Sequence, residues 1–241
     1  MSRQRSICLT IAGFDPCGGA GLLADIKTFE QLKLQGMSVC TANTIQTENE
    51  FHSVNWINQD IIFEQLNTLL QKYEIEFVKI GLIESVDFLN RIVEILRAHK
   101  VKTIVWDPIF SASAGFEFHS EENEFRNILS KIDIVTPNWN EFKTLFKCAY
   151  SNEFKSENTV YLKGGHREDK LGYDTIIHPK GKFNLKPKGV GKAKHGSGCI
   201  LSAALLGYLC KGYPLQKASL KAKQYTYFRL VSNKSLLATH S

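Results

Sequence analysis

Residues 6–34 read SICLTIAGFDPCGGAGLLADIKTFEQLKL, and this stretch decides the fold. Its first part, Ser6 to Ala12, is an apolar run typical of a buried strand. From Ala20 to Leu34 the apolar residues recur at helical spacing, at Leu22, Leu23, Ile26, Phe29 and Leu32. The chain therefore opens with a strand, a glycine-rich turn and a helix.

The same alternation continues along the chain. Strands are predicted at 38–45, 77–80, 101–106, 132–136 and 159–162, and helices at 61–73 and after Ser85, which is a candidate helix cap. Strands separated by helices of this length are joined by parallel crossovers, so the predicted fold is α/β, a three-layer α/β/α sandwich with a mostly parallel central sheet.

The pattern changes after residue 173. Two short strand-like runs, 173–178 and 182–185, flank Pro179-Lys180-Gly181, which is a hairpin signal and predicts an antiparallel edge. Two helices, at about 197–211 and 215–231, are expected to close the chain. We find no linker, so a single domain spanning residues 1–241 is expected.

Composition limits the classes of function. Of the 241 residues, 43% are hydrophobic and 22% are charged, which is near the average of globular proteins. The formal net charge of +6 is moderate, and without a basic stripe interleaved with aromatic residues we expect no nucleic-acid partner. No apolar segment is long enough to span a bilayer, so no membrane association is expected.

The six cysteines form no C-x-x-C pair and no zinc-like grouping with histidine. Reduced thiols in a cytoplasm fit this usage best. The apolar run behind the basic N-terminus is also too short for a signal peptide, so a cytoplasmic location is expected.

The segment KHGSGCILSAA, residues 194–204, is a glycine turn that leads into an apolar helix. The backbone N–H groups of Gly196, Ser197 and Gly198 can converge on a phosphate where that helix begins. Cys199 lies at the junction, and a helix N-terminus should make its thiol easier to ionise. The alternative is a glycine-rich loop before a buried helix, with Cys199 as a small core residue.

Further candidates follow other predicted strands. Ligands of open parallel sheets bind beyond the carboxyl ends of the strands. Residues at that end are Gly13, Asp15, Gln46, Asp107, Asn138 and Lys163. These groups are therefore expected to converge on one cleft.

The turn after the first strand is a poor match to the dinucleotide fingerprint G-x-G-x-x-G, because Asp15 and Pro16 interrupt the spacing. No suitable acidic residue follows the second strand either, which argues against a nicotinamide-dependent dehydrogenase. Asp15 is better suited to hydrogen bonding a neutral polar molecule. Its alternative role is to cap the helix that follows.

On the other side of the expected cleft, Asp107 is placed to meet a metal or a phosphate-bound water. Asn138 and Glu141 have the spacing of a capping box, which is compatible with a rigid site for Mg²⁺-bound phosphate. Lys163, followed by two glycines, suits a nucleotide phosphate, unless it is simply solvated. His195 is a candidate phosphate-side donor or an ordinary loop residue.

Taken together, these motifs resemble those of the hydroxymethylpyrimidine and phosphomethylpyrimidine kinases, in the ribokinase-like superfamily. Order and spacing match from about Ile7 to Lys211. The resemblance is carried by IAG (11–13) with Asp15, GGAGLLADIKT (18–28), KIG (79–81), DP (107–108), TPN (136–138) with Glu141, KGGH (163–166) and HGSGC (195–199) with LSAA (201–204).

The resemblance implies ATP- and Mg²⁺-dependent phosphorylation of 4-amino-5-hydroxymethyl-2-methylpyrimidine and then of its monophosphate, in thiamine biosynthesis. It also implies a homodimer. The implied acceptor site contains Gly13, Asp15 and Gln46. The implied nucleotide and metal side contains Asp107, Asn138, Glu141, Lys163 and His195, with an anion hole at Gly196, Ser197 and Gly198. Cys199 would be the base that accepts the hydroxymethyl proton.

The chain departs from the family's usual pattern at several positions. Phe14 replaces a small hydroxyl residue, Thr47 replaces asparagine, and Lys194 replaces threonine and would add positive charge beside the phosphates. The segment 233–241 lacks the usual Gly-His-Gly-rich ending. Two alternatives therefore stay open, a pyridoxine or pyridoxal kinase and a catalytically silent pyrimidine-binding protein.

Overall fold

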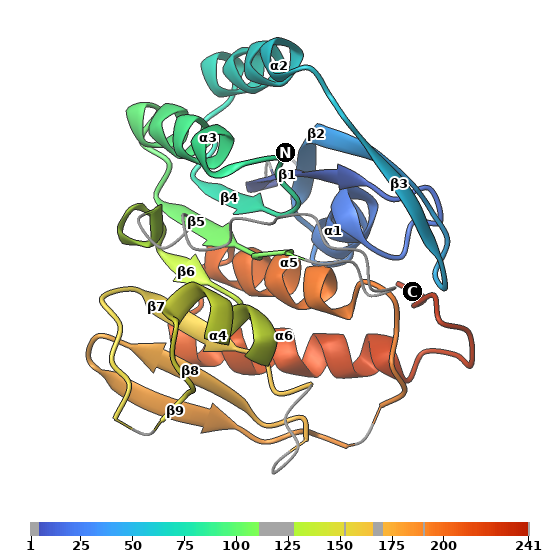
Figure 1. Ribbon diagram of the computed structural model, residues 1–241, viewed down its shortest axis with the longest axis vertical. Coiled ribbons are helices and arrows are strands. Elements are labelled where there is room, and N and C mark those ends of the chain that lie inside the picture. Colours follow the sequence, from blue (N-terminus) through green and yellow to red (C-terminus); the bar gives the residue numbers. More distant parts are fainter. Residues whose placement is uncertain (1–4, 111–127, 152, 166–170, 190, 241) are drawn as a thin grey trace.

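A computed structural model of the chain describes residues 5–110, 128–151, 153–165, 171–189 and 191–240 (Figure 1). The described strands form one sheet in the order β3-β2-β1-β4-β5-β6-β7-β8-β9. In chain order the strands are β1 (Ile7–Phe14), β2 (Gln35–Gln46), β3 (Phe51–Trp56), β4 (Phe77–Ile80), β5 (Thr103–Trp106), β6 (Ile134–Val135), β7 (Thr159–Leu162), β8 (Asp174–His178) and β9 (Gly181–Leu185). The helices are α1 (Gly21–Gln31), α2 (Gln59–Lys72), α3 (Val86–Ala98), α4 (Trp139–Phe146), α5 (Ser197–Cys210) and α6 (Leu215–Leu230).

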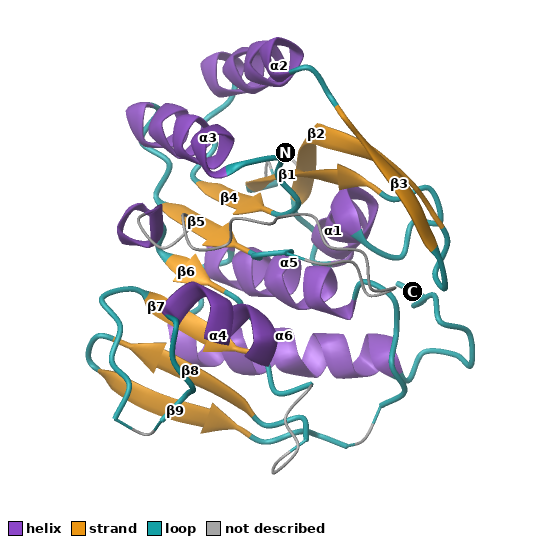
Figure 2. Ribbon diagram, viewed as in Figure 1, coloured by secondary structure: helices purple, strands orange, loops and turns teal. Residues whose placement is uncertain are grey.

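Helices cover both faces of this sheet, as Figure 2 shows. In spatial order, the strands β2, β1, β4, β5, β6 and β7 are parallel. At one edge β3 is antiparallel to β2; at the other, β8 is antiparallel to β7 and β9 to β8. Side chains of α2, α3 and α4 pack in one buried cluster, and those of α1, α5 and α6 pack in a second. The three-layer α/β/α fold predicted from the sequence is thus confirmed.

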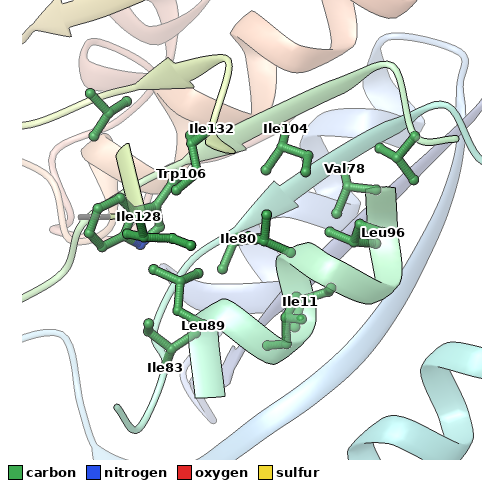
Figure 3. Packing of buried hydrophobic residues seen from close by; sticks show 14 of the residues in the cluster. Ile11, Val78, Ile80, Ile83, Leu89, Leu96, Ile104, Trp106, Ile128 and Ile132 are labelled. Carbon is green, nitrogen blue, oxygen red and sulfur yellow. The ribbon is translucent and has the colours of Figure 1, made fainter. Parts of the chain in front are cut away.

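In the first cluster, the apolar residues that recur at helical spacing in α3 form its buried face. Leu89 and Leu96 of α3 lie against Ile80 and Ile104 of neighbouring strands (Figure 3), and all four side chains are fully buried. Burial of each such side chain stabilises the fold by about 1.5–3 kcal/mol. The hydroxyl of Ser85 accepts the N–H of Phe88 at 3.2 Å and so caps α3 as predicted.

Two differences from the prediction concern the β2 edge. The second strand is longer than expected and the strand β3 was not predicted, so the sheet has antiparallel strands at both edges. Most side chains of β3 are exposed or only half-buried. This edge strand is joined to the sheet by antiparallel pairing with β2, and with its side chains exposed or half-buried it carries little hydrophobic alternation that could predict it.

A fully buried ion pair lies beneath the carboxyl ends of the strands. The ammonium of Lys79 in β4 contacts both carboxylate oxygens of Asp25 in α1, at 2.6 and 2.7 Å, and Thr10 donates a third hydrogen bond to that carboxylate. Burial lowers the pKa of Lys79, but the charge of Asp25 more than offsets this and raises the pKa above its usual value. The pair links α1 to the centre of the sheet.

We expect Lys79→Met to destabilise the protein by about 3–5 kcal/mol, because the Asp25 carboxylate would remain buried without its counter-charge. The double variant Lys79→Met/Asp25→Leu should recover most of that loss. Urea denaturation monitored by circular dichroism measures both. The exposed Lys102→Met is the control and should leave the stability nearly unchanged. An equally small effect of Lys79→Met would contradict the role assigned to the pair.

Candidate active site

One cleft of about 560 Å³ lies at the carboxyl ends of the strands. It is lined by all twelve residues that the sequence predicts for the site, namely Gly13, Asp15, Gln46, Asp107, Asn138, Glu141, Lys163, His195, Gly196, Ser197, Gly198 and Cys199. Phe14 and Lys194 also line it, whereas Thr47 does not. The rule that places ligands at this end of a parallel sheet therefore gathers the predicted residues correctly.

The glycine turn before α5 is held by direct backbone packing. Gly196 has a φ of 70°, and a Cβ at this position would lie 2.0 Å from the carbonyl oxygen of Gly19. Only glycine fits there. No side chain caps the start of α5, and the N–H of Ser197 makes only a long hydrogen bond, 3.3 Å, to the Lys194 carbonyl. The first turn can therefore bind an anion in the cleft once that long bond opens.

Cys199 lies in the first turn of this helix and is buried. Burial is the main reason that its pKa is raised to about 11; the charge of Lys79 lowers it, and the carboxylates of Asp107 and Asp25 raise it further. The expectation that the helix N-terminus makes the thiol easier to ionise is therefore wrong for this ligand-free protein. Desolvation and two nearby carboxylates outweigh the charge of Lys79 and a hydrogen bond from the Gly21 backbone, which favour the thiolate.

Asp107, Lys163 and Glu141 form an ion cluster next to the start of α5. The ammonium of Lys163 lies 2.8 Å from Asp107 Oδ1 and 3.5 Å from Glu141 Oε2. Thr136 and Ser202 also donate hydrogen bonds to the Asp107 carboxylate, at 3.0 and 3.1 Å. A Cβ on Gly198 would lie 3.3 Å from the Lys163 ammonium, so the cluster borders the predicted anion site.

Burial and charge have opposite effects within this cluster. Burial raises the pKa of Asp107, but the ammonium groups of Lys163 and Lys79 hold it below its usual value. Burial raises the pKa of Glu141 to about 7, with Lys163 acting against the increase and Asp107 adding to it. Once Glu141 ionises, the cluster therefore holds two carboxylate charges, and the single ammonium of Lys163 does not balance both.

Asn138 and Glu141 form a capping box at the start of α4. Asn138 Oδ1 accepts the N–H groups of Asn140 and Glu141, both at 2.9 Å, and Glu141 Oε2 accepts the N–H of Asn138 at 2.5 Å. The predicted cap is confirmed. It fixes the Glu141 carboxylate beside Lys163.

Asp15 is the centre of a hydrogen-bond network between two loops. Its carboxylate accepts the N–H groups of Cys17, Gly19 and Ala20, the thiol of Cys17 and the ring Nε2 of His195, the last at 3.0 Å. Burial raises the pKa of Asp15, but the hydrogen bonds from His195, Cys17 and Ala20 hold it well below its usual value. His195 thus lies beside Asp15, and its phosphate role stays a prediction.

The other predicted acceptor residues lie close to Asp15. Gln46 donates to Thr44 Oγ1 at 2.8 Å, and Thr44 donates to the carbonyl of Phe14 at 2.9 Å. A Cβ on Gly13 would lie 3.0 Å from the Leu82 side chain, so glycine allows Leu82, which also lines the cleft, to pack closely on β1. His166, part of the motif after β7, lies outside the described residues.

Comparison with known proteins identifies the family. The family model described as phosphomethylpyrimidine kinase matches residues 15–240. A hydroxymethylpyrimidine/phosphomethylpyrimidine kinase of Aquifex aeolicus is 33% identical over 95% of this chain and 96% of its own length. The chain belongs to the phosphomethylpyrimidine kinase family. The corresponding enzyme of Salmonella typhimurium is 34% identical over 84% of this chain and 82% of its own.

Solved structures share the fold of this phosphomethylpyrimidine kinase family member. A phosphomethylpyrimidine kinase of Clostridium difficile superposes with a TM-score of 0.77 at 29% identity, over 92% of this chain and 98% of that one. A pyridoxal kinase of Staphylococcus aureus in complex with ADP has a TM-score of 0.87 at 23% identity, over 99% and 94% of the two chains. No helix in the described part of this chain is both long and apolar enough to cross a membrane.

Sequence reasoning assigned no role to several residues of this family member's site. Thr136 and Ser202 hold Asp107, and Cys17 contacts Asp15, yet each is a common small residue in a motif quoted for other reasons. Phe51 reaches the cleft from the unpredicted strand β3. Cys17 is only two positions from Asp15, so its proximity could be predicted from the sequence. The partners of Asp107 lie 29 and 95 positions away and could not.

Lys194 contacts the C-terminal segment, which the sequence did not predict. Its ammonium is bonded to the carbonyl and side chain of Asn233, at 3.0 and 2.6 Å, and to the carbonyl of Ser235. The N–H of His195 also donates to the Leu236 carbonyl at 3.0 Å. The C-terminal segment thus returns to the turn before α5 (Figure 1), and Lys194 helps to hold it there. Its partners are neutral and it lines the cleft, so the expected positive charge beside the phosphates stays a prediction.

We expect Lys194→Met to lower the free energy of unfolding by about 1 kcal/mol, since the buried ammonium loses its hydrogen bonds to the exposed residues Asn233 and Ser235. The exposed Lys192→Met should leave stability unchanged. Chemical denaturation measures both, and the KM for ATP is measured alongside. Unchanged stability with a raised KM for ATP would instead show that Lys194 acts on the phosphates.

Glu141 generates a pH-dependent prediction. The pKa of Glu141 is about 7 in the folded protein against 4.5 for the free group, so its ionisation destabilises the folded state. The stability that protonated Glu141 contributes is present below pH 4.5 and is lost as the pH rises through 7. Relative to Glu141→Gln, the wild type should lose on the order of 2 kcal/mol between pH 5 and pH 8. Urea denaturation across that range measures this. The exposed Glu64→Gln is the control and should follow the wild-type curve.

Proposed function

We propose that this protein transfers the γ-phosphoryl group of ATP to 4-amino-5-hydroxymethyl-2-methylpyrimidine and then to its monophosphate, in thiamine biosynthesis. The observation that carries the proposal is the single cleft that holds both halves of the site. Asp15 and Gln46 lie on the acceptor side, and Lys163 and the start of α5 lie on the phosphate side. Membership of the phosphomethylpyrimidine kinase family supports the choice of acceptor.

Positioning and charge stabilisation make the largest contribution to phosphoryl transfer. In the proposed mechanism the backbone N–H groups of Gly196, Ser197 and Gly198 hold the transferred phosphoryl group, as the open start of α5 allows. Lys163 borders that position and would neutralise charge on the nucleotide phosphates. Asn138 and the rigid start of α4 would support the polyphosphate from the opposite side. The proposed role of His195 is as a donor next to the phosphates.

The carboxylates of Asp107 and Glu141 fit Mg²⁺, because hard divalent cations prefer carboxylate oxygens. One ammonium group, that of Lys163, already contacts both, so the two carboxylates are close enough to share a positive charge. Bound there, Mg²⁺ would neutralise phosphate charge and offset the carboxylate of Asp107, which raises the pKa of Cys199.

Cys199 is the proposed general base. The hydroxymethyl oxygen attacks the γ-phosphorus as the bond from that phosphorus to the β–γ bridging oxygen breaks, and the hydroxyl proton passes to the Cys199 thiolate. Because the thiol has a pKa of about 11 in the ligand-free protein, we expect turnover to rise with pH through the neutral range. Lys79 is the fixed positive charge that favours the thiolate.

On the acceptor side, Asp15 and Gln46 would hold the ring nitrogen and amino group of the pyrimidine, with Gly13 allowing the ring to approach the backbone. All hydrogen bonds described for Asp15 come from the protein itself, so ring binding requires one donor, such as His195, to give way. Phe14 lines the same part of the cleft and offers an aromatic surface to the ring.

Other expectations also stay predictions. A homodimer, a cytoplasmic location, a single domain over residues 1–241 and the absence of a nucleic-acid partner rest on the sequence and on the resemblance. Size-exclusion chromatography with light scattering tests the first of these.

Product formation tests the proposed activity. Purified protein is mixed with Mg-ATP and the hydroxymethylpyrimidine, and phosphorylated products are followed by mass spectrometry. We expect the monophosphate first and the diphosphate after it. Pyridoxal is the competing acceptor, because a pyridoxal kinase of Staphylococcus aureus solved with pyridoxal shares the fold at 25% identity and a TM-score of 0.83. Folded protein that releases no product from the pyrimidine would refute the proposal.

We expect Cys199→Ala to lower kcat by ~10²–10⁴-fold, the usual contribution of a general base, with little change in the KM for the pyrimidine. Cys199→Ser keeps the shape of the side chain but not its acidity, and it should lose a similar factor. Steady-state kinetics between pH 6 and pH 9 should show a rise in the wild type that both variants lack. Turnover close to that of the wild type in either variant removes Cys199 from the mechanism.

A further inference from the structure

Asp15, Cys17 and His195 bring three different metal-binding atoms together at the acceptor end of the cleft. Cys17 Sγ lies 3.1 and 3.2 Å from the two carboxylate oxygens of Asp15, and His195 Nε2 lies 3.0 Å from Oδ2. One ligand atom from each residue lies within 4.8 Å of the other two. Asp15 and His195 are 180 positions apart in the chain, so no spacing pattern in the sequence reveals the group.

We propose that these three residues form a binding site for a zinc-class divalent cation, distinct from the Mg²⁺ site proposed at Asp107 and Glu141. Thiolate, imidazole and carboxylate are the ligands that Zn²⁺ selects, whereas Mg²⁺ takes oxygen ligands. Zinc bond lengths of about 2.3 Å to sulfur and about 2.0 Å to nitrogen or oxygen place the ligand atoms of a tetrahedral site roughly 3.2–3.6 Å apart. The contacts of Asp15 with Cys17 and His195, between 3.0 and 3.2 Å, need only a few tenths of an ångström of expansion. The Cys17 and His195 ligand atoms lie within 4.8 Å of each other, so small side-chain rotations bring them to tetrahedral spacing.

The backbone around the group is already arranged for a ligand. The turn that carries Asp15 and Cys17 is closed by hydrogen bonds from Gly19 and Ala20 to the Asp15 carboxylate. The turn that carries His195 packs directly on it, since a Cβ on Gly196 would lie 2.0 Å from the Gly19 carbonyl oxygen. Little backbone ordering is therefore left for the metal to impose.

The group has three protein ligands and one open side. Asp15 and His195 line the cleft, so a fourth ligand, water or a nitrogen of a bound ring, would come from that side. This is the coordination of zinc sites that exchange ligands, not of closed structural ones. If Asp15 binds the acceptor as proposed above, a metal held here competes with the acceptor; this consequence alone rests on the proposed function.

Cobalt is a direct probe, because a tetrahedral Co²⁺ site with a thiolate ligand gives a sulfur-to-metal charge-transfer band. Metal-stripped, full-length protein is titrated with Co²⁺ and the near-ultraviolet and visible spectra are recorded. We expect the band to saturate at one equivalent and to disappear when Zn²⁺ is added. Cys17→Ser should abolish the band and weaken Zn²⁺ binding at least 100-fold, measured by competition with a chromogenic chelator.

Two further variants separate this site from other thiols and from misfolding. The exposed Cys148→Ser should keep the full charge-transfer band. His195→Ala should weaken Zn²⁺ binding at least 10-fold, and thermal melts verify that each variant is folded. A wild type with no charge-transfer band at one equivalent, or a folded Cys17→Ser variant with an unchanged band, overturns the proposal and leaves only a hydrogen-bonded cluster.

Inhibition provides a separate readout. Micromolar Zn²⁺ should raise the KM for the acceptor in the wild type, a chelator should reverse this, and Cys148→Ser should respond in the same way. A spectroscopic site without competition refutes the placement of the acceptor against Asp15 and leaves the metal site standing. A protein without kinase activity but with the cobalt band refutes the proposed function alone.

Discussion

The backbone contact between Gly196 and Gly19 is the constraint on which the rest of the site depends. A single added methyl group at residue 196 would lie 2.0 Å from the Gly19 carbonyl oxygen, so both turns must remain without side chains at this point. The contact brings the loop after β1 against the start of α5, although the two are far apart in the chain. It therefore places Asp15, the proposed acceptor residue, beside the first turn of α5, and phosphoryl transfer requires such closeness of two bound molecules.

Charge around that contact is balanced only in part. Three carboxylates, Asp25, Asp107 and Glu141, interact with two ammonium groups, Lys79 and Lys163. The buried pair of Lys79 and Asp25 is neutral and fixed by short contacts, whereas Lys163 is shared between Asp107 and Glu141. Ionised Glu141 leaves one negative charge in excess, which is the condition under which a cation is attracted to a largely desolvated site. Capping of α4 by the same Glu141 keeps that charge in place.

The sequence predicted the layers of the fold and the membership of the cleft because both depend on local patterns. Apolar periodicity identifies α3 and β7, and the end of each parallel strand identifies residues such as Asp107 and Lys163. It did not predict β3, whose exposed side chains carry no alternation, or the partners of Lys194, which lie 39 and 41 residues further along the chain. The hydrogen bonds from Cys17 and His195 that surround Asp15 are tertiary contacts of the same kind. Local pattern thus indicates which residues meet, and packing decides what each of them contacts.

The pKa of Cys199 shows most clearly how tertiary packing can override a local sequence pattern. A helix N-terminus favours a thiolate by typically 0.3–1 kcal/mol, and by up to about 2 kcal/mol when partly buried. The pKa of Cys199 is nevertheless raised from 9.0 to about 11. Burial supplies most of that difference and the charges of Asp107 and Asp25 add to it. If a cation binds at Asp107 as proposed, it would offset that carboxylate and lower the pKa of Cys199. Thiolate chemistry would then be limited to enzyme that carries nucleotide and cation.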